Sequence, residues 1–306
     1  MQDDVTAAPT PGVAARASTF RIDESVVSAL LAEQFPRWAS REVRPVAHGG
    51  NDHRMFRVGD DLSARLPSAP GYVPQVRKEQ EWLPRLAPEL PLPIPAVAGR
   101  GEPSPHFAAP WSVYRWMPGA PASITPPTDW GRFAADLAGF LRRLQAVDTS
   151  GAPDPGPHSA YRGGPVGHWD DEMGSLLQRV HGRERDLADG MWRDALDAPF
   201  TGPPVWFHGD VALGNLLVDD GELSAVIDFG CAGVGDPACD AVFRWTAPDA
   251  AARQQFHRDY DADEAAWARA RGWALWKGLI MLTNKPPGQA KFARDVLDRL
   301  FADVSA

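Results

Sequence analysis

Residues 207–215 read Phe-His-Gly-Asp-Val-Ala-Leu-Gly-Asn, and residues 227–230 read Ile-Asp-Phe-Gly. Two short apolar runs lie between these stretches and flank Asp219-Asp220-Gly221. An Asp-Gly pair between such runs predicts a β-hairpin. Because a hairpin brings its two open ends together, we expect Asn215 and Asp228 to be near neighbours.

The chemistry expected at the mouth of this hairpin is that of a metal site beside a base. One amide oxygen, from Asn215, and one carboxylate, from Asp228, suit a hard cation such as Mg²⁺. Asp210 lies five residues before Asn215 and could accept a proton from a bound hydroxyl without being a metal ligand. The alternative, a hairpin with solvated acids at its ends, leaves the joint spacing of these residues unexplained.

The order and spacing of Asp210, Asn215 and Asp228 resemble the catalytic base and the two metal ligands of protein kinases, where positioning and charge neutralisation do nearly all the catalytic work. The His-Gly-Asp opening at 208–210 and the Gly-Asp-Pro-Ala-Cys-Asp run at 235–240 resemble the aminoglycoside phosphotransferase family, also called the antibiotic kinase or small-molecule kinase family. The resemblance covers about residues 20–302. It implies a two-lobed, protein-kinase-like α+β fold with a β-rich N-terminal lobe and a mostly helical C-terminal lobe.

The resemblance also implies a role for each motif residue. Asp210 would be the catalytic base, and Asn215 and Asp228 would hold the Mg²⁺ of a bound ATP or GTP. Three further residues would support the loop. His208 would do so by packing and hydrogen bonding rather than by carrying a proton. Asp236 and Asp240 would do so by hydrogen bonds to the loop backbone.

The first part of the chain predicts an antiparallel meander of strands at 43–47, 55–58 and 62–66. A turn of two glycines, Gly49 and Gly50, joins the first two strands and could bring backbone amides against phosphates. A plain hairpin turn is the alternative from the residues alone. The resemblance implies a loop that covers the nucleotide at this point.

The third predicted strand carries Arg65 where the resemblance implies a phosphate-binding lysine. A guanidinium can neutralise phosphate and pair with a carboxylate, but it is not interchangeable with an ammonium group. We expect Glu79 on the following helix to be its partner, with Glu81 as the alternative. The resemblance further implies that backbone groups at Arg115 and Met117 bind the nucleotide base at the hinge between the lobes.

The domain organisation expected from these segments has three parts. Residues 1–18 would be a disordered leader, residues 19–117 a nucleotide-binding lobe, and residues 118–306 a catalytic and substrate-binding lobe.

Charge is distributed unevenly along the 306 residues and limits the partners. Residues 1–120 contain 13 basic and 13 acidic side chains, whereas residues 121–306 contain 18 basic and 27 acidic ones. This acidity argues against a nucleic-acid partner and would favour a cationic small molecule. The alternative is an acidic surface that only keeps the protein in solution.

An acidic cluster around Asp263 and Glu264 is a candidate for substrate binding, although acids are also favoured at a helix N-terminus.

The remaining composition is that of a cytoplasmic enzyme. No run of 18 or more apolar residues is present, so we expect no membrane span. The two cysteines, Cys231 and Cys239, cannot form a disulfide framework, and we expect reduced thiols. The chain would act as a monomer or a homodimer.

The functional hypothesis that follows is an ATP- or GTP-dependent phosphotransferase with an alcohol group as acceptor. Its acceptor would be an aminoglycoside-like antibiotic. The alternative keeps the reaction and changes the acceptor to a macrolide or a small metabolite alcohol of the choline, homoserine or sugar type. A third hypothesis, a nucleotide-binding protein without turnover, would follow if Arg65 fails to replace the lysine.

Overall fold

The computed structural model describes most of the chain, namely residues 20–46, 52–284 and 287–304. The leader expected at 1–18 and the turn expected at Gly49 and Gly50 lie outside the described residues. The chain divides into two compact units. One contains the described residues up to Pro88 together with Ile94–Met117, and the other contains the short segment Glu89–Pro93 together with the chain from Pro118 onward.

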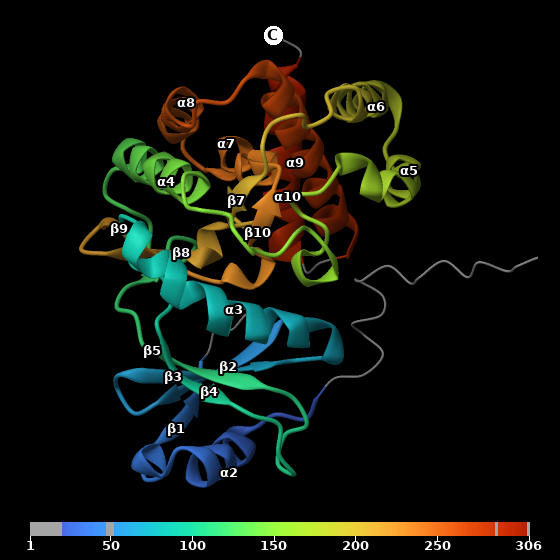
Figure 1. Cartoon of the computed structure of the whole chain (residues 1–306). Coiled ribbons are helices and arrows are strands. Elements are labelled where there is room, and N and C mark those ends of the chain that lie inside the picture. Colours follow the sequence, from blue (N-terminus) through green and yellow to red (C-terminus); the bar gives the residue numbers. More distant parts are fainter. Residues whose placement is uncertain (1–19, 47–51, 285–286, 305–306) are drawn as a thin grey trace, which may run out of the picture. The chain divides into compact units, whose positions relative to one another are not determined.

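The first unit is built on a five-stranded antiparallel sheet with strand order β1-β2-β3-β5-β4 (Figure 1). Its strands are β1 (Val43–Pro45), β2 (His53–Val58), β3 (Leu62–Pro67), β4 (Val97–Gly101) and β5 (Trp111–Arg115). Its α-helices are α2 (Glu24–Gln34) and α3 (Val73–Leu86). The antiparallel meander predicted from the sequence is therefore present, with β5 inserted between β3 and β4.

Alternation along β3 explains how the two helices cover this sheet. Successive side chains of a strand point to opposite faces. Leu62, Ala64 and Leu66 belong to a core cluster that also contains buried side chains of α2. Arg65 points to the other face, where it pairs with Glu79 of α3. One face of the sheet is thus apolar, and the other carries a buried ion pair.

The second unit is mostly helical. Its α-helices are α4 (Trp130–Gln145), α5 (Asp170–Leu177), α6 (Gly182–Leu196), α7 (Phe243–Thr246), α8 (Ala250–Asp259), α9 (Glu264–Asn284) and α10 (Pro287–Asp303). Its short strands are β6 (Ala120–Pro121), β7 (Val205–Phe207), β8 (Leu216–Asp219), β9 (Glu222–Val226) and β10 (Gly233–Gly235). Together the two units form the α+β, protein-kinase-like fold expected from the resemblance. No helix in the described part of the chain has the length and apolar character needed to cross a membrane.

The predicted hairpin is present as β8 and β9. Asp219 pairs with Glu222, so the turn consists of two residues, Asp220 and Gly221. Both have a positive φ, 49° and 80°, as the tight turns of hairpins require. At the open end, the backbone N–H of Ile227 donates to the carbonyl oxygen of Asn215 at 2.9 Å. The hairpin therefore places Asn215 beside the residue that precedes Asp228.

Candidate active site

In the first unit, the candidate phosphate-binding side chain is held by a buried ion pair. Nη1 of Arg65 contacts Oε2 of Glu79, and the side chains are 9% and 2% exposed. The hydroxyl of Tyr114 donates to the same carboxylate oxygen at 3.2 Å. Glu81, the alternative partner, instead pairs with Arg85 at 3.2 Å on the exposed side of α3. Arg65 is thus paired with Glu79, as predicted, while its contact with a nucleotide stays a prediction.

The expected hinge lies at the end of the same unit. The backbone N–H of Arg115 donates to the carbonyl oxygen of Ala96 at 2.9 Å, and the N–H of Trp116 donates to that of Asp61 at 2.8 Å. These bonds fix the backbone as β5 ends, just before Met117. The binding of a nucleotide base at Arg115 and Met117 stays a prediction.

In the second unit, Asp240 holds the backbone of the candidate catalytic loop. Its two carboxylate oxygens accept hydrogen bonds from the N–H groups of His208 and Gly209, each at 2.7 Å. Gly209 has a φ of +82°, and a Cβ atom added to it would lie 2.6 Å from the carbonyl oxygen of Cys231. Only glycine combines this conformation with this close approach. Asp240 and a glycine at 209 therefore both support this backbone conformation of the loop.

His208 links the loop to the open end of the hairpin. Its ring is fully buried, and Nε2 lies 3.0 Å from the carbonyl oxygen of Ile227. Nδ1 accepts a hydrogen bond from the N–H of Asp210 at 3.2 Å. Because Nδ1 accepts, Nε2 carries the proton of a neutral ring and donates to Ile227. Both ring nitrogens are thus engaged in holding the backbone around Asp210 and Asp228.

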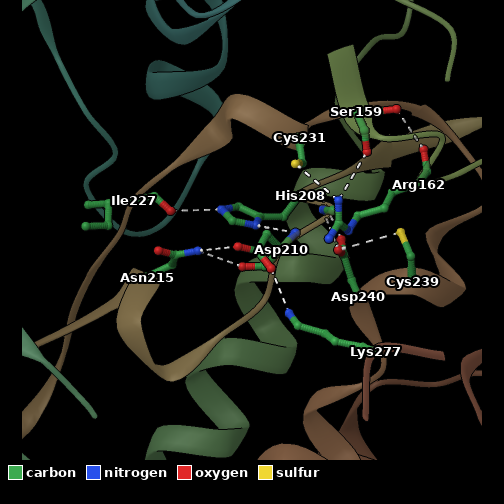
Figure 2. Close-up of polar contacts among 11 residues, drawn as sticks. Ser159, Arg162, His208, Asp210, Asn215, Ile227, Cys231, Cys239, Asp240 and Lys277 are labelled. Carbon is green, nitrogen blue, oxygen red and sulfur yellow. Dashed lines mark hydrogen bonds and ion pairs between the residues drawn. The ribbon is translucent and has the colours of Figure 1, made fainter. Parts of the chain in front are cut away.

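Asp210, the candidate base, lies between Asn215 and Lys277 (Figure 2). Nδ2 of Asn215 donates to its Oδ2 at 3.0 Å and to its backbone oxygen at 2.9 Å. Nζ of Lys277 donates to its Oδ1 at 2.7 Å. Burial raises the pKa of Asp210, but the charges of Lys277 and Arg162 outweigh burial and hold that pKa well below its ordinary value. The carboxylate is therefore ionised and able to accept a hydrogen bond from a hydroxyl.

The expected metal ligands are the amide of Asn215 and the carboxylate of Asp228. Asp228 follows β9, is half-buried and has a φ of +67°. The donor set of one carboxylate and one amide oxygen fits Mg²⁺, which keeps waters and phosphate oxygens in its remaining positions. Mg²⁺ binding at these two residues stays a prediction.

The other predicted residues of this unit lie in different surroundings. Asp236 accepts hydrogen bonds from Arg269 of α9, at 2.7 Å and 3.2 Å, and from the N–H of Ala238, so its contacts lie with α9 rather than with the catalytic loop. Asp263 accepts a hydrogen bond from the N–H of Ala266 and caps α9, and Glu264 begins that helix. The substrate role of Asp263 and Glu264 stays a prediction.

Sequence reasoning missed Lys277 and Arg162. Lys277 lies on α9, and Arg162 lies in the loop before α5. Both line a pocket together with other residues, namely Gly209, Val211, Cys239, Val242, Trp273 and Trp276. One signal was available for Lys277, because it is the only charged residue in the otherwise apolar or glycine stretch 273–282. A single charge on an apolar helix indicates a specific partner. No comparable signal marks Arg162.

The model of the phosphotransferase enzyme family matches residues 42–273. A comparison with curated proteins gives no match.

Several solved structures are similar to this one. The GDP complex of wild-type aminoglycoside 2′-phosphotransferase-IIIa shares 18% sequence identity with a TM-score of 0.72, over 92% of this chain and 100% of that one. The apoenzyme of macrolide 2′-phosphotransferase MphH from Brachybacterium faecium shares 21% identity with a TM-score of 0.59, over 90% and 98%. A thermostable mutant of aminoglycoside phosphotransferase APH(4)-Ia, in a ternary complex with AMP-PNP and hygromycin B, shares 23% identity with a TM-score of 0.60, over 91% and 98%. At these identities the likeness concerns the fold.

Proposed function

The chain belongs to the phosphotransferase enzyme family, and from that premise we propose that it transfers the γ-phosphoryl group of ATP or GTP to a hydroxyl group of a small molecule. The first unit would bind the nucleotide and the second would carry the catalytic loop and the acceptor site. The observation that carries the proposal is the position of Asp210, ionised and held between Asn215 and Lys277.

Each residue has a role that follows from its contacts. Asp210 would accept the proton of the acceptor hydroxyl as that oxygen attacks phosphorus. Asn215 and Asp228 would hold Mg²⁺, which when bound neutralises charge on the phosphates. Arg65, oriented by Glu79, would neutralise a further phosphate charge. His208 and Asp240 would keep the loop in place without touching the reacting atoms.

Two classes of acceptor are candidates. An aminoglycoside-like antibiotic is supported by the His-Gly-Asp motif, by the acidity of residues 121–306, and by solved structures of this fold described as complexes with kanamycin and with gentamicin. A macrolide or a small metabolite alcohol is favoured by the pocket beside Asp210. That pocket is lined in part by two tryptophans, Trp273 and Trp276, whose rings would suit an apolar body.

The direct test is phosphoryl transfer by purified protein with Mg²⁺ and ATP or GTP, across aminoglycosides, macrolides and metabolite alcohols. Asp210→Asn should abolish transfer while nucleotide affinity stays within about twofold, because the base makes no ground-state contact with the nucleotide. Asp228→Asn should weaken Mg²⁺-dependent nucleotide binding about tenfold or more. Asp186→Asn, on the exposed surface of α6, is the control and should change neither property. Equal loss of both properties in Asp210→Asn would show that the base is assigned wrongly.

A further inference from the structure

We propose that Lys277 is a further catalytic residue, whose ammonium group contacts the phosphoryl group as it passes from the nucleotide to the acceptor. Before the reaction the same ammonium group is paired with Asp210. The inference rests on the proposed phosphotransferase function and adds a residue to the machinery of the same site.

Lys277 reaches the site from helix α9 and ends beside the candidate base. Its Nζ lies 2.7 Å from Oδ1 of Asp210, while Nδ2 of Asn215 lies 3.0 Å from Oδ2 (Figure 2). In the proposed reaction the acceptor oxygen comes within about 3 Å of Asp210, and the phosphorus comes within about 3.5 Å of that oxygen. The ammonium group would therefore lie next to the transferred group, and the flexible stem of lysine allows it to turn toward that group.

The ammonium group has donors available for a second partner. A lysine carries three N–H donors, and within the described residues Asp210 is the only hydrogen-bond and ion-pair partner of Lys277. The side chain of Lys277 is 25% exposed and lines a pocket together with Gly209 and Val211, which flank Asp210 in sequence. A phosphoryl oxygen could thus accept a hydrogen bond from Lys277 while the bond to Asp210 is still present.

The chemistry of the transfer strengthens this contact as the reaction proceeds. The acceptor oxygen forms a bond to the γ-phosphorus, the bond from that phosphorus to the bridging oxygen breaks, and its electron pair leaves with the nucleoside diphosphate. The hydroxyl proton goes to the carboxylate of Asp210, which becomes neutral. Lys277 thereby loses the charge of its partner in the step that brings a negatively charged phosphoryl group to the acceptor. A contact that is stronger in the transition state than in the ground state lowers the barrier.

Arg162, Asp240 and Glu172 are charged side chains that line the pocket or contact its lining residues. Arg162 donates to a backbone oxygen and to a sulfur atom, Asp240 accepts from the backbone of the catalytic loop, and Glu172 accepts from an indole N–H. Within the described residues neither carboxylate forms an ion pair with Lys277. When Asp210 takes the proton, the phosphoryl oxygens are therefore the anions that can replace it as the partner of Lys277.

The experiment compares turnover by the wild type, Lys277→Gln and Lys277→Arg, each as the full chain with Mg²⁺ and saturating ATP or GTP. The acceptor is an alcohol that the wild type phosphorylates, or water where only hydrolysis is seen. Rates are compared on the alkaline plateau of the pH profile, where Asp210 is ionised in every variant. We expect Lys277→Gln to lower kcat on that plateau about 100-fold, as the loss of one donor to developing charge does in other enzymes.

Ground-state binding and a charged replacement separate a catalytic role from a structural one. The affinity of Lys277→Gln for Mg²⁺ and AMP-PNP should stay within about twofold of the wild type, because the contact develops during transfer. Lys277→Arg keeps a cationic donor, so it should retain more activity than Lys277→Gln. Lys291→Gln, which removes an exposed cation of α10, is the control and should change neither rate nor affinity.

Two results would overturn the inference. A plateau rate of Lys277→Gln equal to that of the wild type would mean that Lys277 acts only on the ionisation of Asp210. An equal loss of kcat and of AMP-PNP affinity in Lys277→Gln would mean that the lysine supports the site before transfer begins.

Turnover by the wild type distinguishes the failure of this inference from the failure of the proposed function. Turnover in the wild type together with an unchanged plateau in Lys277→Gln would reject only the role of Lys277. The absence of Mg²⁺-dependent nucleotide binding and turnover in the wild type would reject the phosphotransferase function itself.

Discussion

The ammonium group of Lys277 and the carboxylate of Asp210 are joined by a 2.7 Å hydrogen bond across 67 residues of sequence. The bond ties helix α9 to the catalytic loop, whose backbone is already held by Asp240. Because Asn215 donates to the other oxygen of Asp210, the carboxylate is oriented on both sides. In the proposed reaction, an acceptor hydroxyl would approach a carboxylate whose orientation is set before the acceptor binds.

Replacing Lys277 with glutamine should move the acid limb of the pH–rate profile upward. The charges of Lys277 and Arg162 overcome the effect of burial and keep the pKa of Asp210 below its ordinary value, so the base stays ionised as the pH falls. Without the ammonium group that pKa rises, and the acid limb of kcat/KM should shift upward by roughly one pH unit or more. Lys291→Gln, which removes an exposed ion pair with Asp295, should leave the profile in place. An unchanged profile in Lys277→Gln would show that Asp210 is not the group that titrates.

Alanine at two glycines of the second unit should have opposite effects. Gly209→Ala forces a non-glycine residue into a left-handed conformation and against the backbone oxygen of Cys231, so the free energy of unfolding should fall by about 2 kcal/mol. Gly190 lies inside α6, and a Cβ atom added to it would meet open space, so Gly190→Ala should raise the free energy of unfolding by about 0.5–1 kcal/mol. Urea denaturation measures both values. Equal effects would mean that the loop can adopt another backbone path.

Much of the second unit's site could be predicted because its signals are local in sequence. Asp219, Asp220 and Gly221 encode a two-residue turn, and the turn alone brings Asn215 beside Ile227. Alternation along β3 likewise predicts that Arg65 leaves the apolar face of its sheet. These features depend on residue periodicity and turn chemistry, which a single sequence carries.

The contacts of Lys277 and Arg162 could not be predicted in the same way. The helical pattern around Trp267–Leu282 predicts α9, but it does not say which face meets a loop some 67 residues earlier. Arg162 lies in a stretch rich in glycine and proline, where no period constrains the side chain. The contacts of both residues depend on how elements distant in sequence pack together. The sequence alone therefore does not predict the positive charge beside Asp210.

His53 should make the stability of the first unit pH-dependent near neutrality. Burial lowers the pKa of His53 well below its ordinary value, and the charge of Arg65 lowers it further. Below about pH 6.5 the unfolded chain binds a proton that the folded chain excludes. The free energy of unfolding therefore falls by up to about 1.4 kcal/mol for each unit by which the pH is lowered. His53→Leu should remove that slope, whereas His106→Leu, at an exposed position, should keep it. Denaturation between pH 5 and pH 8 measures the slopes, and equal slopes in the wild type and His53→Leu would contradict the assignment.

The two glutamates of α3 should respond differently to neutralisation. Glu79 is buried against Arg65, so Glu79→Gln leaves a buried guanidinium without its countercharge and should lower the free energy of unfolding by about 3 kcal/mol. Glu81 pairs with Arg85 on the exposed side of the helix, and Glu81→Gln should change stability by less than about 1 kcal/mol.

The same pair of variants tests the phosphate role proposed for Arg65. If Glu79 orients the guanidinium for a nucleotide, Glu79→Gln should weaken the binding of Mg²⁺ and AMP-PNP at a temperature where the variant is still folded, and Glu81→Gln should not. Arg65→Lys keeps the charge on a shorter, single-point donor, so it should retain more nucleotide affinity than Arg65→Met. Circular dichroism confirms folding, and calorimetry measures affinity. Equal affinity in Arg65→Lys and Arg65→Met would mean that the charge of Arg65 serves the ion pair with Glu79 and not the phosphates.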